Sequence, residues 1–173
     1  MNKVWFITGC STGFGRELAK CVLKLGYKAV VTSRNTNDVN DIVTSYEDSA
    51  IAVALDVTKQ EDINTAVTQA LQKFGRIDVL VNNAGIGYFG AIEESEEDEV
   101  RRMFEINFWG LTHVTKAILP LMRKQRSGHI INISSIGGLV AFPALGFYNA
   151  TKFAVTAYSE ALAKETAHLG IKV

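Results

Sequence analysis

Cysteine and proline are scarce in this sequence, which has two of each in 173 residues. Cys10 and Cys21 are too few for a disulfide scaffold, and no cysteine or histidine spacing matches a zinc site, so no metal is expected. The lack of proline, together with 47% apolar residues, argues against a disordered chain. The length fits one domain, residues 1–173, with enough chain to bury a sizeable core.

An excess of charge of either sign is also absent, because 18 Lys and Arg residues balance 18 Asp and Glu residues. A nucleic-acid partner is therefore not expected. No apolar run is long enough to span a bilayer, and the first segment, MNKVWFITGC, enters a strand pattern without a secretory apolar region. The sequence predicts a soluble, cytoplasmic protein with no membrane partner.

What the sequence does contain is one unit repeated along its length. Each repeat is a short apolar run, then turn residues, then a helical pattern that ends at a glycine. The expected strands lie in the runs VWFIT, KAVVTS, IAVAL, IDVLVNN, HIINIS and IKV. The expected helices cover residues 14–25, the segment between Thr58 and Gly75, residues 95–126 and residues 147–169. Strands that alternate with helices predict βαβ units, and hence an α/β fold with a doubly wound, Rossmann-type parallel sheet.

Capping residues indicate where two of these helices begin. Thr58 with Glu61 forms the pattern of a capping box, and Ser95 with Asp98 is expected to open the long third helix. Gly75 is expected to close the second helix.

The same pattern is interrupted at the end of the sequence. Gly170 precedes Ile171, Lys172 and Val173 as earlier glycines precede strands, so these residues predict a sixth strand that is truncated. Natural domains rarely stop inside a core strand. We therefore expect the chain to be the N-terminal part of a longer protein, or a shortened form of one.

A glycine-rich segment, TGCSTGFG, joins the first strand to the first helix. In an open α/β sheet a dinucleotide pyrophosphate binds here, on the free N–H groups and positive dipole end of the helix. Its hydroxyl groups could contact phosphate. The alternative is a turn that serves geometry alone, since the spacing differs from the commoner G-x-G-x-x-G. The candidate cofactor-binding residues are Gly9, Ser11, Thr12, Gly13, Phe14 and Gly15.

Cys10 lies inside the turn, where a helix start can lower a thiol pKa, but a packing role is favoured.

The end of the second strand, VVTSRN, distinguishes between two dinucleotides. An NAD site usually places an acidic residue about 20 residues after the glycines, but no acid precedes Asp38 here. Arg34 can instead hold a 2′-phosphate through a bidentate contact, with Ser33 and Asn35 beside it. A solvated surface arginine is the alternative. The sequence therefore favours NADP(H), with NAD(H) still allowed.

Two further strand ends supply candidate cofactor contacts. Asp56 follows the third strand, with Val57 next to it, and because Thr58 is the better helix cap, Asp56 is free to bind the adenine amino group. An ordinary turn carboxylate is an equally good interpretation. The segment NNAG follows the fourth strand, where its backbone would lie close to a ribose. Its candidate residues are Asn83, Ala84 and Gly85.

Asn107 lies on the apolar stripe of the third helix. The stripe runs through Val100, Phe104, Leu111, Val114, Ile118 and Leu121. A buried amide without hydrogen-bond partners costs about 1–3 kcal/mol, so its presence needs a reason. It is either a satisfied structural asparagine or a polar group that holds water or a neighbouring side chain.

The segment YNATK places Tyr148 and Lys152 one turn apart on one face of the last helix. Such a pair by itself is usually helix surface. Hydride transfer to or from a carbinol carbon needs a group that gives or takes the hydroxyl proton. A free tyrosine has a pKa of about 10, and a neighbouring ammonium favours the phenolate form. Between the strand end NISS and Tyr148 lie four apolar residues that could line a substrate pocket or pack the loop: Phe142, Pro143, Leu145 and Phe147.

Together, TGCSTGFG, NNAG, the Asn107 helix, NISS and YNATK resemble the short-chain dehydrogenase/reductase family in order and spacing, over essentially the whole chain. The resemblance implies that Ser135, rather than its neighbour Ser134, is catalytic with Tyr148 as acid/base. It also implies that Lys152 holds the nicotinamide ribose and that Asn107 supports a water chain. Arg34 is similar to the basic residue of NADP-preferring members.

The expected activity is therefore the interconversion of a small-molecule carbonyl compound and a secondary alcohol with NADP(H). The family also implies a homodimer or homotetramer, in which the Asn107 and Tyr148 helices form the interface. A dinucleotide-sensing protein without turnover is the main alternative, but a sensor needs no Ser135, Tyr148 and Lys152 set. An inactive fragment of such an enzyme is a further one.

Overall fold

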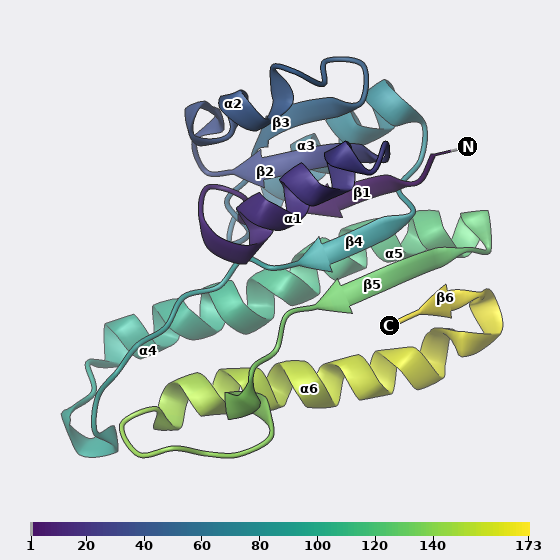
Figure 1. The fold of residues 1–173 in the computed structure, drawn as a ribbon. Coiled ribbons are helices and arrows are strands. Elements are labelled where there is room, and N and C mark those ends of the chain that lie inside the picture. The colour runs from purple at the N-terminus through teal and green to yellow at the C-terminus, as the bar shows by residue number, and fades with distance from the viewer. Residues whose placement is uncertain (1) are drawn as a thin grey trace.

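Six parallel strands form one sheet in the order β3-β2-β1-β4-β5-β6 (Figure 1). The computed structural model describes residues 2–173. The strands are β1 (Val4–Ile7), β2 (Lys28–Ser33), β3 (Ala50–Ala54), β4 (Val79–Asn82), β5 (Gly128–Asn132) and β6 (Ile171–Lys172). The chain runs outward from β1 to β3, returns to β4 and runs outward on the other side to β6. The predicted doubly wound parallel sheet is confirmed.

The reversal of strand order positions the site. Trp5 pairs with Ala29 of β2 on one side of β1 and with Val79 of β4 on the other. The connections that follow β1 and β4 lead to opposite sides, so a crevice opens at the carboxyl ends of these two neighbouring strands.

Helices cover both faces of the sheet because strand side chains alternate between the faces. The helices are α1 (Gly13–Lys24), α2 (Asn40–Val43), α3 (Gln60–Phe74), α4 (Glu97–Phe104), α5 (Leu111–Gln125) and α6 (Gly146–Thr166). One core contains Phe6, Leu80 and residues of α3, α5 and α6. The other contains Ile7 and residues of α1 and α2. Each buried strand therefore contributes to two cores, which explains its nearly continuous apolar sequence.

The predicted helix at residues 95–126 is a helical path with a change of pitch. A π-helical segment, Glu105–Gly110, joins α4 to α5, and Asn107 lies within it. Gly110 ends this segment. A Cβ there would lie 2.6 Å from the Val57 side chain, so the helical path passes close to the segment that follows β3.

The buried face of each half differs by one residue from the predicted apolar stripe. Met103 and Met122 are fully buried. Phe104 and Leu121, which the apolar stripe placed in the core, are only half-buried. Neighbouring residues on a helix lie about 100° apart, so the residue beside an expected core position can take its place.

The predicted capping box of Thr58 and Glu61 does not form. α3 begins at Gln60, and the preceding Lys59 makes no side-chain cap. The Thr58 N–H and hydroxyl both donate to the Asp56 carboxylate, at 3.0 and 2.7 Å. This local turn competes successfully for the side chain that would otherwise cap the helix.

The predicted cap of Ser95 with Asp98 is also wrong. The Ser95 hydroxyl donates to the carbonyl of Ala91 at 2.8 Å, and α4 begins only at Glu97.

The 3-10 turn (Thr36–Asp38) and α2 between β2 and β3 were not predicted, because such short helices show no apolar period. The glycine helix ends are confirmed at Gly75 and Gly170, each with φ 74°. Within residues 2–173, no helix is both long and apolar enough to cross a bilayer.

Candidate active site

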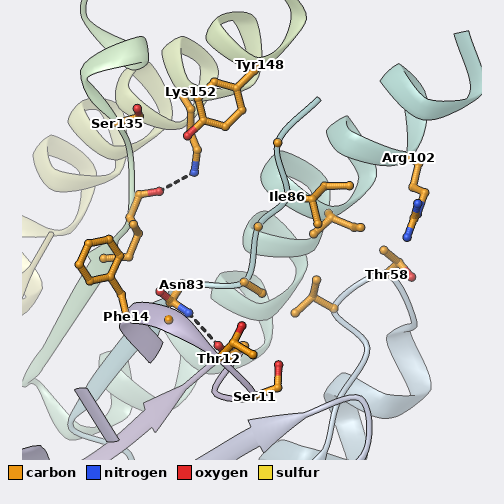
Figure 2. A pocket seen from close by; sticks show the side chains of 18 of the residues that line it. Ser11, Thr12, Phe14, Thr58, Asn83, Ile86, Arg102, Ser135, Tyr148 and Lys152 are labelled. Atoms are coloured by element: carbon orange, nitrogen blue, oxygen red, sulfur yellow. Dashed lines mark hydrogen bonds between the residues drawn. The ribbon is translucent and has the colours of Figure 1, made fainter. Parts of the chain in front are cut away.

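A cleft of about 900 Å³ lies at the carboxyl edge of the sheet, where the sequence motifs converge (Figure 2). Segments that follow β1, β2, β3, β4 and β5 line it, together with the first turns of α6. Of the residues predicted from sequence, those that line it are Gly9, Ser11, Thr12, Gly13, Phe14, Ser33, Arg34, Asp56, Val57, Asn83, Ala84, Gly85, Ser135, Tyr148 and Lys152. Gly15, Asn35 and Asn107 lie behind or beside this surface.

The glycine turn after β1 is packed against the segment after β4. Asn83 Nδ2 donates to the carbonyls of Thr8 and Gly9 at 3.0 and 2.9 Å. A Cβ at Gly15 would lie 2.4 Å from both Asn83 Nδ2 and the Gly9 oxygen, so only glycine fits there. Gly15 thus acts through close approach of the two segments.

The first turn of α1 offers its backbone to the cleft. Thr12 precedes the helix in extended conformation, and its side chain does not cap it. Gly9 and Gly13 both have positive φ, 70° and 60°. N–H groups at the start of a helix that no side chain caps form a natural site for an anion. This turn fits a pyrophosphate.

Arg34 directly follows β2 on the cleft lining and is exposed. Ser33 is buried and accepts the Asn35 N–H at 3.3 Å. The Asn35 side chain faces the following turn instead of the cleft and accepts the Asn37 N–H at 3.1 Å. Of these three residues, Arg34 is therefore the one whose charged side chain is available to a ligand in the cleft.

Asp56 is not free in the sense predicted from sequence. Its carboxylate already accepts two hydrogen bonds from Thr58. Burial acts to raise the pKa of Asp56, but the Thr58 hydrogen bonds and the charges of Lys59 and Arg34 outweigh it, so the pKa lies below its ordinary value. Asp56 is thus held as an anion on the cleft wall.

Asn107 makes hydrogen bonds to Ile86 and Thr151. It accepts the Ile86 N–H and donates to the Ile86 carbonyl, both at 2.8 Å. Its amide also lies 3.2 Å from the Thr151 hydroxyl, which donates to the Tyr148 carbonyl. The π-helical segment thus connects the loop after β4 to the helix that carries Tyr148.

Tyr148, Lys152 and Ser135 meet at one end of the cleft (Figure 2). Lys152 Nζ donates to the carbonyl of Ile133 at 2.8 Å and lies 5.8 Å from the centroid of the Tyr148 ring. Lys152 is only 7% exposed, and burial lowers its pKa. Ser135 Oγ accepts the Gly137 N–H at 3.1 Å.

The two serines of NISS have different surroundings. Ser134 Oγ lies 3.3 Å from the Lys152 carbonyl and 3.0 Å from Thr156 Oγ1. It is therefore tied to the backbone of α6. Ser135 caps the short 3-10 turn (Ile136–Gly138) and keeps a hydroxyl hydrogen for a ligand.

Several cleft residues were missed by sequence analysis. Arg102 of α4 points toward Thr58 across the cleft, and Ile86 lies between them and Lys152 (Figure 2). Phe89 adds apolar surface, and Leu145, which the sequence offered as possible pocket lining, also lines the cleft. No motif singles out Arg102, Ile86 or Phe89. The predicted packing role of Cys10 is confirmed: it is fully buried, and burial raises its pKa to about 12 despite a hydrogen bond with Thr32.

The model of the short chain dehydrogenase family matches residues 3–173. The chain is 44% identical over 171 residues to 3-ketodihydrosphingosine reductase of Bacteroides thetaiotaomicron, covering 99% of this chain and 61% of that protein. It is 40% identical over 174 residues to oxidoreductase BOA17 of Botryotinia fuckeliana, covering 100% of this chain and 64% of that protein. The chain thus spans less than two thirds of the length of both relatives.

Solved structures show the same fold. A short-chain dehydrogenase from Streptomyces avermitilis superposes with TM-score 0.96 at 45% identity, over 100% of this chain and 64% of that one. ElxO with NADP bound gives 0.94 at 37%, over 100% and 71%. The 3-ketoacyl-(acyl-carrier-protein) reductase from Brucella melitensis, complexed with NADH, gives 0.95 at 38%, over 99% and 73%. Similar structures therefore hold either nicotinamide dinucleotide.

Proposed function

The chain belongs to the short-chain dehydrogenase/reductase family, and we propose that it interconverts a carbonyl compound and a secondary alcohol by hydride transfer with NADP(H). The observation that supports this most is the meeting of Tyr148, Lys152 and Ser135 in the same cleft as the glycine turn. A dinucleotide sensor would need the turn but not the three polar side chains.

The cleft would hold the dinucleotide along its length. The glycine turn and the start of α1 would bind the pyrophosphate. Asp56 and Val57 would lie at the adenine, and Asn83, Ala84 and Gly85 at a ribose. When bound, the nicotinamide supplies or accepts the hydride.

Tyr148 would transfer the proton at its phenol oxygen. In reduction it donates to the carbonyl oxygen as the alcohol forms, and in oxidation it accepts the hydroxyl proton. Lys152 places an ammonium near the ring, which stabilises the phenolate left after donation. Ser135 would donate its hydroxyl to the same substrate oxygen and stabilise its negative charge. Lys152 would also bind the nicotinamide ribose, and Asn107 would support a water chain behind it.

The preference for NADP(H) rests on Arg34. It is exposed on the cleft lining beside the anionic Asp56. A guanidinium there can form two charge-assisted hydrogen bonds with a 2′-phosphate. NAD(H) lacks this group and would bind more weakly.

The substrate proposed is a carbonyl compound with an apolar chain. Ile86, Phe89 and Leu145 line the cleft, and Phe89 is 75% exposed. Phe147, which the sequence offered either as pocket lining or as loop packing, lines a separate groove beside Trp109. That groove lies along α4 and the first turn of α6, where a second copy of the chain would pack in the homodimer or homotetramer we propose. Exposed Phe153 and Ala157 extend the apolar surface along α6.

The experiment follows NADPH consumption with a panel of carbonyl compounds of increasing alkyl chain length. The wild-type chain is expected to turn over and to favour the longer chains. The Tyr148→Phe variant should bind NADPH without turnover. If the wild-type chain binds NADPH but reduces none of these compounds, the result would favour the dinucleotide sensor instead.

A further inference from the structure

Asn149 follows Tyr148 on α6 and is 2% exposed. Its side chain makes two hydrogen bonds to a single surface loop. Asn149 Nδ2 donates to the Gly137 carbonyl at 3.0 Å, and Asn149 Oδ1 accepts the Phe142 N–H at 3.0 Å. One buried amide thus holds both ends of residues 137–142.

The loop has little apolar burial of its own to hold it. Ile136, Leu139 and Val140 expose 64%, 65% and 53% of their surface. Only the backbone of Gly137 and Gly138 is buried between α6 and β5. The position of the loop therefore depends on polar contacts with α6, among which those of Asn149 span it.

Gly137 connects the hydrogen bonds of Asn149 to Ser135. Its carbonyl accepts from Asn149, while its N–H donates to Ser135 Oγ at 3.1 Å. Because that N–H occupies an acceptor position on Oγ, the hydroxyl hydrogen is directed elsewhere. A Cβ at Gly137 would lie 2.5 Å from Asn149 Nδ2, 3.4 Å from Tyr148 Cε1 and 3.5 Å from Ser135 Oγ. Gly137 is therefore the point at which these three side chains pack together.

We propose that Asn149 is a positioning residue, which fixes the Ser135 hydroxyl relative to Tyr148 through the backbone of Gly137. Asn149 itself does not touch the reacting atoms. This inference rests on the proposed function, in that Ser135 polarises the substrate oxygen. Its structural part, the dependence of the Gly137–Ser135 hydrogen bond on Asn149, does not require turnover.

The test compares Asn149→Ala and Asn149→Asp with the wild-type chain. The alanine removes both hydrogen bonds. The aspartate keeps an acceptor for Phe142 and places an oxygen against the Gly137 carbonyl, and it provides the same test if the alanine variant does not fold. Both should lower kcat by about tenfold to a hundredfold, as a misplaced reacting group does, with the Kd for NADPH within about twofold of wild type.

The decisive measurement is a double-mutant cycle with Ser135→Ala. If Asn149 acts through Ser135, replacing it in the Ser135→Ala background should lower kcat by less than about threefold. Equal losses in both backgrounds would overturn the proposal, since they would indicate a general effect on the fold. Thr166→Ala, at a residue buried to a similar degree at the far end of α6, is the control for lost helix stability.

Amide hydrogen exchange gives a second readout that is independent of activity. In the Asn149 variants the Gly137 N–H should lose protection, although Asn149 does not bond to it directly. The Phe142 N–H should lose protection in Asn149→Ala in any case. Unchanged protection at Gly137 would overturn the proposal. If Gly137 loses protection in the variants but the wild-type chain turns over no substrate, the proposed function is refuted. The structural part of the inference, that Asn149 holds the Gly137–Ser135 hydrogen bond, is then still supported.

Discussion

Lys152 and Tyr148 face one cleft from successive turns of α6, with the ammonium nitrogen 5.8 Å from the ring centroid. The nitrogen donates to the Ile133 carbonyl and is largely buried. A buried cation with a single protein acceptor is costly, because it has lost most of its hydration. The site therefore keeps a positive charge beside a phenol at the expense of stability, which is typical of functional sites.

Tyr148→Phe is expected to abolish catalysis and preserve the site. The ring still packs, but no group remains to exchange a proton, and the loss of kcat should be about a hundredfold or more. The Kd for NADPH should stay within about twofold of wild type. Steady-state kinetics and a binding titration on the same preparation would check this. Appreciable residual turnover would contradict the role of Tyr148.

The stability contribution of Lys152 should depend on pH. Burial lowers its folded-state pKa below the ordinary value of 10.5. Below the folded-state pKa both states hold the proton, and the desolvation cost is fully present. Between the two pKa values the unfolded chain binds more protons, so native stability rises with pH in that window.

Urea denaturation of wild type and Lys152→Met, from neutral pH upward, would measure this. The free energy of unfolding of wild type should increase relative to that of the variant as pH approaches 10.5. Lys164→Met, an exposed substitution on the same helix, is the control. A difference that stays constant with pH would mean that Lys152 carries no desolvation cost.

Arg34→Ala is expected to weaken NADPH binding by roughly tenfold to a hundredfold, the loss of charge-assisted hydrogen bonds to a phosphate. NADH has no 2′-phosphate, and its Kd should change by less than about twofold. Isothermal titration with both dinucleotides would separate the two effects. Arg123→Ala is the matched control, because Arg123 is exposed on α5 and lies outside this cleft. Equal losses for NADPH and NADH would remove the assignment of NADP(H).

The two cysteines should differ in reactivity. Cys10 is fully buried with a pKa raised to about 12, whereas Cys21 is exposed on α1. An aromatic disulfide reagent should therefore modify one thiol of the native chain rapidly and the second only after denaturation. Peptide mapping would identify the fast site as Cys21. Rapid modification of Cys10 in the native chain would show that the glycine turn opens readily.

Sequence reasoning was least successful where a local contact competes with a motif. Thr58 and Ser95 are both residue types that cap helices. Their hydroxyls instead donate to the Asp56 carboxylate and the Ala91 carbonyl. Both outcomes depend on backbone conformation just outside the helix, which residue identity does not specify. The buried partners of Asn107 were equally inaccessible, since Ile86 and Thr151 are distant from it in the chain.

The sequence by itself determined the strand and helix alternation, the parallel sheet and the edge at which TGCSTGFG, NNAG, NISS and YNATK converge, because short-range periodicity and glycine placement follow from backbone sterics. Only the tertiary structure decided which side chains meet at that edge. It gave Ser134 and Ser135 different hydrogen-bond partners, placed Arg102 in the cleft and connected Asn149 to the loop that follows Ser135. Such contacts join residues far apart in the chain, and their distances are set by how the helices pack on the sheet.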